Sequence, residues 1–162
     1  MDGQYKGLEH LELWQVAMDF AQMVCKQVIP IMPLEEKWVL SSQLRRAVQS
    51  VPANIAERYG RYYYQDNVRF CYIARGSLEE ALTHFTLANR LNYLPDDQYH
   101  QLVDDIHRLR RLLNGYIAYL KTSKRGATEP GSNLSIRETQ QTYLFDSPSD
   151  LYPDSFEPVD QP

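Results

Sequence analysis

The sequence lacks an apolar run near the ~18 residues that a membrane span needs, and its start lacks the charged-then-apolar pattern of a secretion signal. These absences argue against an integral membrane protein and against secretion. Cysteine is scarce, because Cys25 and Cys71 are the two in the chain, and they form neither a Cys-x-x-Cys pair nor a metal-binding spacing. We interpret them as buried thiols in a reducing cytoplasm.

The common signatures of catalysis are also missing. The seven glycines form no Gly-rich phosphate loop, and neither Gly-x-Ser-x-Gly nor His-Glu-x-x-His occurs. A di-iron bundle would need Glu-x-x-His pairs that face inward. The nearest pattern, Asp97-x-x-His100 and Asp104-x-x-His107, shares one helix face that is not the apolar one. We interpret it as a solvated polar face, with a metal site as the alternative, and predict no catalytic residue, metal or cofactor.

Charge divides the chain into two parts. Residues 1–125 carry 16 basic and 14 acidic residues, whereas residues 126–162 carry one basic and seven acidic residues. The second part also holds five of the nine prolines and has no helical period. We therefore predict a folded domain over 1–125 and a disordered or extended acidic tail over 126–162.

Apolar residues recur every three or four positions in the first part, which is the period of a helix face. This period predicts four helices, over about residues 8–29, 35–59, 65–92 and 95–121. The apolar stripes are, in chain order, Leu11, Trp14, Met18, Ala21, Cys25 and Val28; Leu40, Leu44, Ala47, Val48, Val51 and Ile55; Cys71, Ala74, Leu78, Ala81, Phe85, Ala88 and Leu91; and Tyr99, Leu102, Ile106, Leu109, Leu113, Tyr116 and Leu120. No alternating run indicates a strand. We predict an all-α fold, an antiparallel four-helix bundle.

Proline and glycine mark special points within these helices. Pro52 removes the hydrogen bond to the carbonyl of Val48, so we expect a kink rather than a stop, with Ser50 helping to satisfy the freed backbone groups. Gly60 is the expected end of the second helix. The small residues Gly76 and Ser77 predict that a neighbouring helix approaches the third helix closely.

Residues 58–75 combine arginines with aromatic side chains. They include Arg58, Tyr59, Arg61, Tyr62, Tyr63, Tyr64, Arg69, Phe70, Tyr72 and Arg75. Guanidinium groups pair with phosphates, and aromatic rings stack on exposed bases, so this composition favours nucleic-acid binding. The alternative is that the arginines cap helices, pair with acids or lie in oligomer interfaces, and that the tyrosines pack. Arg45 and Arg46, with Arg108, Arg110 and Arg111, add positive charge on other predicted helices.

Five motifs occur in order along the helical part of the chain. They are Leu13-Trp14-Gln15, Ser42-Gln43-Leu44-Arg45-Arg46-Ala47, Ser50-Val51-Pro52-Ala53-Asn54-Ile55-Ala56-Glu57, Ala74-Arg75-Gly76-Ser77-Leu78-Glu79-Glu80 and Arg90-Leu91-Asn92-Tyr93-Leu94. Through them, over about residues 8–122, the chain resembles the bacterial four helix bundle protein family. That family includes the 23S ribosomal RNA intervening-sequence proteins and the accessory variability protein of diversity-generating retroelements.

The resemblance implies a homopentameric barrel of four-helix protomers. For the retroelement branch it also implies binding to a reverse transcriptase and to nucleic acid, RNA or DNA, through basic surfaces. By position, Arg45, Arg46, Asn54 and Glu57 are family motif residues, and the alternative role of the last two is to order the second helix. The chain differs from many members by Arg58 in place of glycine, and its core is nearly neutral where the retroelement proteins are markedly basic.

Two functional hypotheses follow. In the first, the protein is a non-catalytic nucleic-acid-binding accessory protein that works as an oligomeric ring; Arg45, Arg46, Arg58, Arg61 and Arg69 contact phosphates, and Tyr62, Tyr63 and Tyr64 stack on bases. In the second, the ring is a protein-only scaffold whose tail docks onto a protein partner. The anchors of that tail are Tyr143, Phe145, Leu151, Tyr152 and Phe156. Two further alternatives are that the tail covers the protein's own basic surface or is a disordered solubilising segment.

Overall fold

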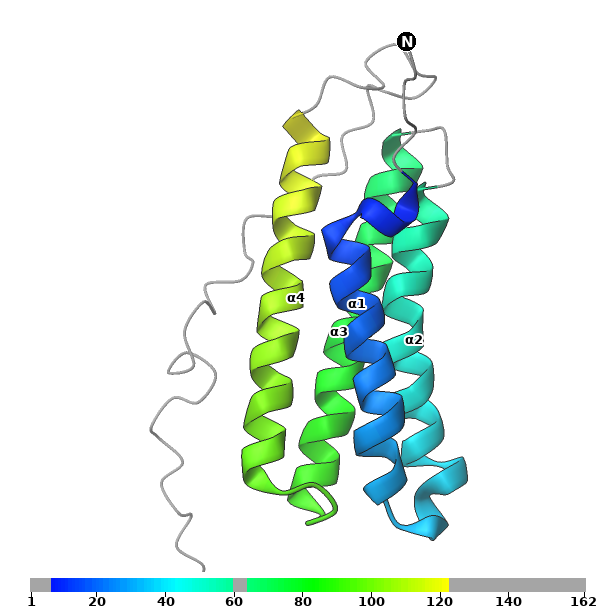
Figure 1. The fold of residues 1–162 in the computed structure, drawn as a ribbon, viewed down its shortest axis with the longest axis vertical. Helices are drawn as coiled ribbons and strands as arrows, with labels where there is room; N and C mark the ends of the chain where they lie inside the picture. Colours follow the sequence, from blue (N-terminus) through cyan, green and yellow to red (C-terminus); the bar gives the residue numbers. More distant parts are fainter. Residues whose placement is uncertain (1–6, 60–63, 123–162) are drawn as a thin grey trace, which may run out of the picture. The chain divides into compact units, whose positions relative to one another are not determined.

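Four long helices form an antiparallel bundle in the computed structural model, which describes residues 7–59 and 64–122 (Figure 1). They are α1 (Glu12–Met23), α2 (Leu40–Tyr59), α3 (Tyr64–Arg90) and α4 (Asp96–Thr122). Each helix packs against two neighbours, in the order α1, α2, α3, α4 and back to α1, so the bundle closes on itself. No strand occurs within these ranges. The predicted all-α bundle is confirmed, and the predicted acidic tail over 126–162 lies outside the described residues.

Short helical turns replace regular helix at both ends of α1 and before α2. A 3₁₀ turn, η1 (Leu8–His10), precedes α1, and a π-helical turn, η2 (Val24–Val28), follows it. Two more 3₁₀ turns, η3 (Ile29–Ile31) and η4 (Leu34–Trp38), lead to α2. The predicted second helix therefore starts five residues too early, at 35 rather than at Leu40. Pro30 and Pro33 lack amide protons, which prevents a regular helix across this segment.

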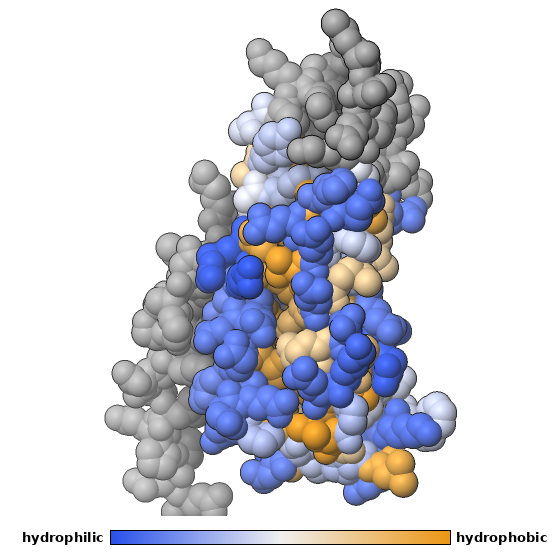
Figure 2. Space-filling model, in the orientation of Figure 1, coloured by the Kyte–Doolittle hydropathy of each residue, from blue (hydrophilic) through white to orange (hydrophobic). Residues whose placement is uncertain are grey.

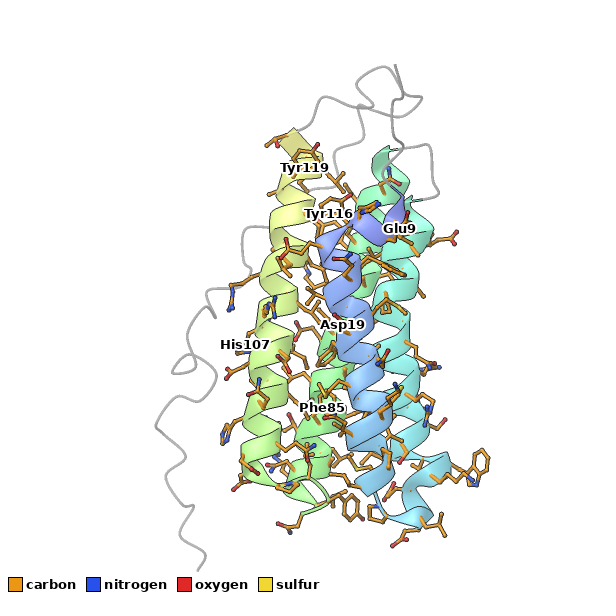
Figure 3. All side chains as sticks on the ribbon, viewed as in Figure 1. Glu9, Asp19, Phe85, His107, Tyr116 and Tyr119 are labelled. Carbon is orange, nitrogen blue, oxygen red and sulfur yellow. The ribbon has the colours of Figure 1, made fainter. Side chains whose placement is uncertain are left out.

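The interior is apolar and is built from one stripe of each helix. The predicted stripe of α2 is buried throughout, that of α3 is buried except for Leu91, and that of α4 is buried except for the half-buried Tyr99 and Tyr116. Phe20 of α1 meets Phe85 of α3 edge to face, with ring centroids 6.3 Å apart; Figure 3 labels Phe85. In α1 the prediction is partly wrong, because Met18 is 42% exposed. The buried residues of that helix are Leu13, Ala17, Phe20 and Ala21, and the buried face continues through Val24 and Val28 of η2.

The expectations at Pro52 and at Gly76 have different outcomes. α2 continues through Pro52 and ends at Tyr59, while Gly60 lies outside the described residues. At Gly76, no atom outside its own stretch of α3 lies within 4 Å of the position that a Cβ would take, so the predicted close approach at that residue is wrong. The neighbouring Ser77 makes the contact instead, because its Oγ lies 2.8 Å from Oγ of Ser50 in α2. The Ser50 hydroxyl therefore joins two helices.

α3 ends in a well-defined cap before the turn to α4. Asn92 takes a left-handed conformation with φ of 58°, which asparagine tolerates better than most residues. The amides of Asn92 and Tyr93 donate to the carbonyls of Asn89 and Ala88 at 2.9 Å each, the pattern of a Schellman cap.

Figure 2 shows the face of the bundle that carries α1 and α4 as mainly hydrophilic, with apolar atoms between the two helices. None of the helices in the described ranges has both the length and the apolar composition needed to cross a membrane.

Candidate nucleic-acid interface

The two arginines predicted on α2 have different surroundings. Arg45 is exposed, and Arg46 reaches across to α3, where its Nη2 lies 3.3 Å from Oε1 of Glu80. The same carboxylate oxygen lies 3.8 Å from Nε2 of His84. Glu80 thus joins Arg46 to His84. Arg46 therefore pairs with an acidic side chain, which was the alternative to phosphate binding.

Most of the predicted stacking and phosphate-binding residues fall where no side chain is described. Arg58 lies in α2 and Tyr64 begins α3, but the described part includes only their backbones. Arg61, Tyr62 and Tyr63 lie outside the described residues, as do the tail residues Tyr143, Phe145, Leu151, Tyr152 and Phe156. Arg69 is described and lies exposed on α3.

A basic and aromatic cluster spans α3 and α4 at the end of the bundle where α3 begins and α4 ends. The ring of Tyr72 has the guanidinium of Arg75 at 4.9 Å and the ammonium of Lys121 at 5.4 Å from its centroid. Arg75 also donates from Nη1 to Oδ1 of Asn114 at 3.0 Å. Arg111 is exposed one turn before Asn114, hence on the same side of α4. We call these five residues the basic seam.

Charge is sorted along α4, which concentrates positive potential at this end. The four acidic residues of the helix all precede its four basic residues. They are Asp96, Asp97, Asp104 and Asp105, followed by Arg108, Arg110, Arg111 and Lys121. The order suits the helix dipole, because anions are stabilised near a helix N-terminus and cations near its C-terminus. It also leaves a basic surface on a domain whose charges otherwise nearly cancel.

The middle of the α3–α4 boundary is structural rather than open to a ligand. The side chain of Arg110 is only 16% exposed, and its Nη1 lies 3.3 Å from Oε1 of Glu79. The Nε2 atom of His107 is buried without a hydrogen-bond partner among the described residues. Burial, and then the nearby Arg110 charge, lower the pKa of His107 below its ordinary value of 6.5. Arg110 therefore serves the packing of α3 on α4, whereas in the seam Arg111 and Lys121 are exposed and Arg75 is half-buried.

Two further aromatic side chains lie at the same end of α4. The rings of Tyr116 and Tyr119 stack with centroids 6.2 Å apart and an interplanar angle of 23° (Figure 3). Tyr119 is 57% exposed, and tyrosine combines an apolar ring with a polar hydroxyl, which suits a contact surface. Proteins that bind single-stranded nucleic acids combine exposed aromatic rings with nearby cationic side chains, and this end of α4 offers both.

The polar face predicted on α4 lies mostly in solvent. Asp97, His100 and Asp104 are exposed, and His107 is half-buried toward α3. Within residues 7–59 and 64–122, no three His, Cys, Asp or Glu side chains gather closely enough to bind a metal ion. Cys71 is buried as predicted, whereas Cys25 is half-buried.

The sequence shows some components of the basic seam but not their proximity. Arg75 and Arg111 were visible as separate basic residues, whereas Asn114 and Lys121 belong to none of the motifs. Only the pairing of α3 with α4 brings the two helices' side chains together. The available signal was the order of charges along residues 96–121, in which all acids come first.

Comparisons with known proteins identify the same type of bundle. A family model described as 23S rRNA-intervening sequence protein matches residues 9–115. A crystal structure of a protein with unknown function from the S23 ribosomal protein family of Bacteroides thetaiotaomicron superposes with a TM-score of 0.61. The two sequences are 24% identical, and the match covers 65% of this chain and 95% of that chain. This likeness shows the fold alone. No curated protein matches the sequence.

Proposed function

The chain belongs to the 23S rRNA-intervening sequence protein family, and from this premise we propose that it is a non-catalytic nucleic-acid-binding accessory protein. The proposal follows the resemblance to the retroelement accessory protein, and it includes assembly into an oligomeric ring. A reverse transcriptase is the proposed protein partner, and RNA or DNA the proposed ligand. No catalytic step is proposed, because the sequence contains no nucleophile, phosphate-loop or metal-binding motif.

The observation that supports binding most is the basic seam. Tyr72 has a cationic group at each of two positions over its ring, Arg75 at 4.9 Å and Lys121 at 5.4 Å, which holds both charges in place. Pre-positioned cations lose less conformational entropy when they meet phosphates. Tyr72 and Arg75 of the seam lie on α3, the helix that follows residues 60–63, so Arg61, Tyr62 and Tyr63 belong to the same basic and aromatic stretch of sequence.

A ring would compensate for the modest charge of a single protomer. The folded part carries only a small excess of basic residues, and dedicated nucleic-acid-binding domains are more basic. Symmetric assembly repeats one basic seam around the ring axis, so several weak contacts act on a single strand. This arrangement gives useful affinity without a strongly basic chain.

Charge reversal at exposed positions of the seam tests the proposal. Lys121→Glu and Arg111→Glu should each weaken binding of a labelled single-stranded RNA about tenfold in fluorescence polarisation at low salt, because each removes a phosphate contact and adds repulsion. Both side chains are exposed, so the fold should tolerate the changes. The matched control is Arg90→Glu, an exposed arginine in the last turn of α3, at the other end of the bundle.

The outcomes separate the two hypotheses. Equal loss in the seam variants and in the Arg90→Glu control would mean that only net charge matters, and the seam would not be the site. An absence of RNA and DNA binding by the unmodified chain would contradict the proposal and favour the scaffold whose tail binds a protein.

A further inference from the structure

An apolar groove runs along the outer face of α1 and α2. Its volume is about 430 Å³, and none of the described residues that line it is charged. Trp14, Met18, Ala21, Gln22 and Cys25 form one wall, and Gln49, Pro52, Ala53 and Ala56 form the other. The indole Nε1 of Trp14 is buried and has no hydrogen-bond partner among the described residues. Because this nitrogen is buried, it adds no exposed polar group to the wall of the groove.

An apolar projection lies on the same chain, in the segment that joins α1 to α2. Leu34 and Trp38 of η4 are each 80% exposed, and the adjacent Val39 is 63% exposed. Figure 2 shows apolar atoms at the surface at the end of the bundle where α1 ends and α2 begins. Scattered single apolar residues are normal on a surface, whereas three large ones within six positions form a candidate contact surface. We call Leu34, Trp38 and Val39 the apolar knob.

We propose that the apolar knob of one copy inserts into the α1–α2 groove of a second copy. This inference rests on the proposed function in that it supplies the contact by which the ring forms. The knob and the groove are different surfaces of one chain, so the contact between copies is head-to-tail. Head-to-tail contacts close into rings when the rotation per copy allows, which fits the proposed assembly.

Charges beside the two surfaces are complementary. Arg45 is exposed one turn before Gln49, so it lies on the side of α2 that lines the groove. Glu35 is exposed beside Leu34 in the knob. An arginine at the edge of the groove can therefore pair with a glutamate that arrives with the knob, and this favours a second copy over an unrelated apolar partner. The same placement assigns Arg45 to the contact between copies rather than to nucleic acid.

Two charged substitutions in the full chain test each side of the contact. Trp38→Glu changes the knob, and Ala53→Glu places a larger, charged side chain in the groove. Both positions are exposed, and glutamate is a good helix former, so circular dichroism should show an unchanged fold. Light scattering after size exclusion should give a multimer for the unmodified chain and a single 19.0 kDa chain for each variant. The matched control Leu87→Glu, at a position 46% exposed on α3, should leave the multimer unchanged.

Mixing the two variants gives the sharper result. The Trp38→Glu chain keeps an intact groove and the Ala53→Glu chain keeps an intact knob, so the mixture should form one-to-one dimers. Three results would overturn the inference: a monomeric unmodified chain, a variant that stays multimeric, or a mixture that stays monomeric. A groove occupied by the tail or by another protein would give the first or the second of these.

The assembly and the nucleic-acid proposal fail in different ways. A chain that binds RNA as a monomer overturns the contact between copies but leaves nucleic-acid binding in place. A multimer that depends on both knob and groove, yet binds neither RNA nor DNA, supports the contact and contradicts the proposed function.

Discussion

His107 lies halfway along α4, and its imidazole is half-buried against α3 (Figure 3). Burial lowers its pKa first, Arg110 and Arg111 lower it further, and the carboxylates of Asp104 and Glu79 act in the opposite direction. The folded protein therefore favours the neutral imidazole. Protonation would place a charge beside Arg110, in a site where Nε2 has no hydrogen-bond partner among the described side chains.

This lowered pKa predicts that stability falls in mild acid. The unfolded chain binds a proton at His107 near the ordinary value of 6.5, whereas the folded chain binds it only at lower pH. The contribution of His107 to the free energy of unfolding is therefore fully present above about pH 6.5 and decreases as pH falls toward the lowered pKa. Urea unfolding between about pH 7 and about pH 5 should show this slope, and His107→Gln should reduce it.

A matched change at His100 is the control. His100→Gln makes the same histidine-to-glutamine change at an exposed position of the same helix. Burial raises the pKa of Asp105, and that contribution has the opposite sign and falls nearer the ordinary value of 3.8. Identical slopes for the unmodified chain and for His107→Gln would contradict the assignment.

At the scale of elements, a chain of hydrogen bonds joins α2 to α3 inside the bundle. Ser77 Oγ donates to the carbonyl of Ile73 at 3.1 Å, so Ser50 Oγ donates to Ser77 Oγ at 2.8 Å. Asn54 Nδ2 in turn donates to Ser50 Oγ at 3.0 Å and to the Ser50 carbonyl at 2.8 Å. Asn54 therefore orders α2 around Pro52, which was one of the two roles left open for that family motif residue.

Ser77→Ala should destabilise the bundle by about 1–3 kcal/mol, because it leaves the part-buried Ser50 hydroxyl without its acceptor. Thermal unfolding measures the loss. The control is Thr83→Ala, because the exposed Thr83 hydroxyl donates to the Glu79 carbonyl of its own helix and to no other group among the described residues. The double variant Ser50→Ala/Ser77→Ala should lose less than the sum of the two single changes. Strictly additive losses would show that the two hydroxyls do not interact.

The helices could be predicted from the sequence, but the orientation of α1 could not. α3 and α4 each present one clear apolar stripe, so periodicity identifies their buried faces. The segment of α1 carries two overlapping stripes, one through Met18 and one through Phe20. Period alone cannot choose between them, and packing against Phe85 selects Phe20. The rejected stripe lines the α1–α2 groove, so this ambiguity itself reflects two apolar surfaces on one helix.

The candidate site was predictable in composition but not in place. Arg45 and Arg46 adjoin in the sequence, yet Arg45 is exposed one turn before Gln49 of the groove, whereas Arg46 pairs with Glu80. The seam's members come from two helices that are distant in the sequence and adjacent in the bundle. Linear patterns do not contain that adjacency, because it depends on how α3 and α4 pair.

At the scale of the whole bundle, the proposed nucleic-acid and assembly surfaces are separate. The basic seam belongs to α3 and α4, and the groove and knob belong to α1, α2 and the segment between them. A contact through the groove therefore leaves the seam open in every copy. This separation is what a ring needs if it is to assemble and bind a strand at the same time.

The salt dependence of RNA binding tests the central claim most directly. If Arg75, Arg111 and Lys121 each neutralise a phosphate of a single strand, the logarithmic slope against salt is about −2 per protomer, or roughly a twentyfold loss of affinity between about 50 and 200 mM salt. We predict a loss of at least this size for the full, unmodified chain in fluorescence polarisation. Affinity that does not change with salt, or no binding at about 50 mM salt, would contradict nucleic-acid binding through the basic seam.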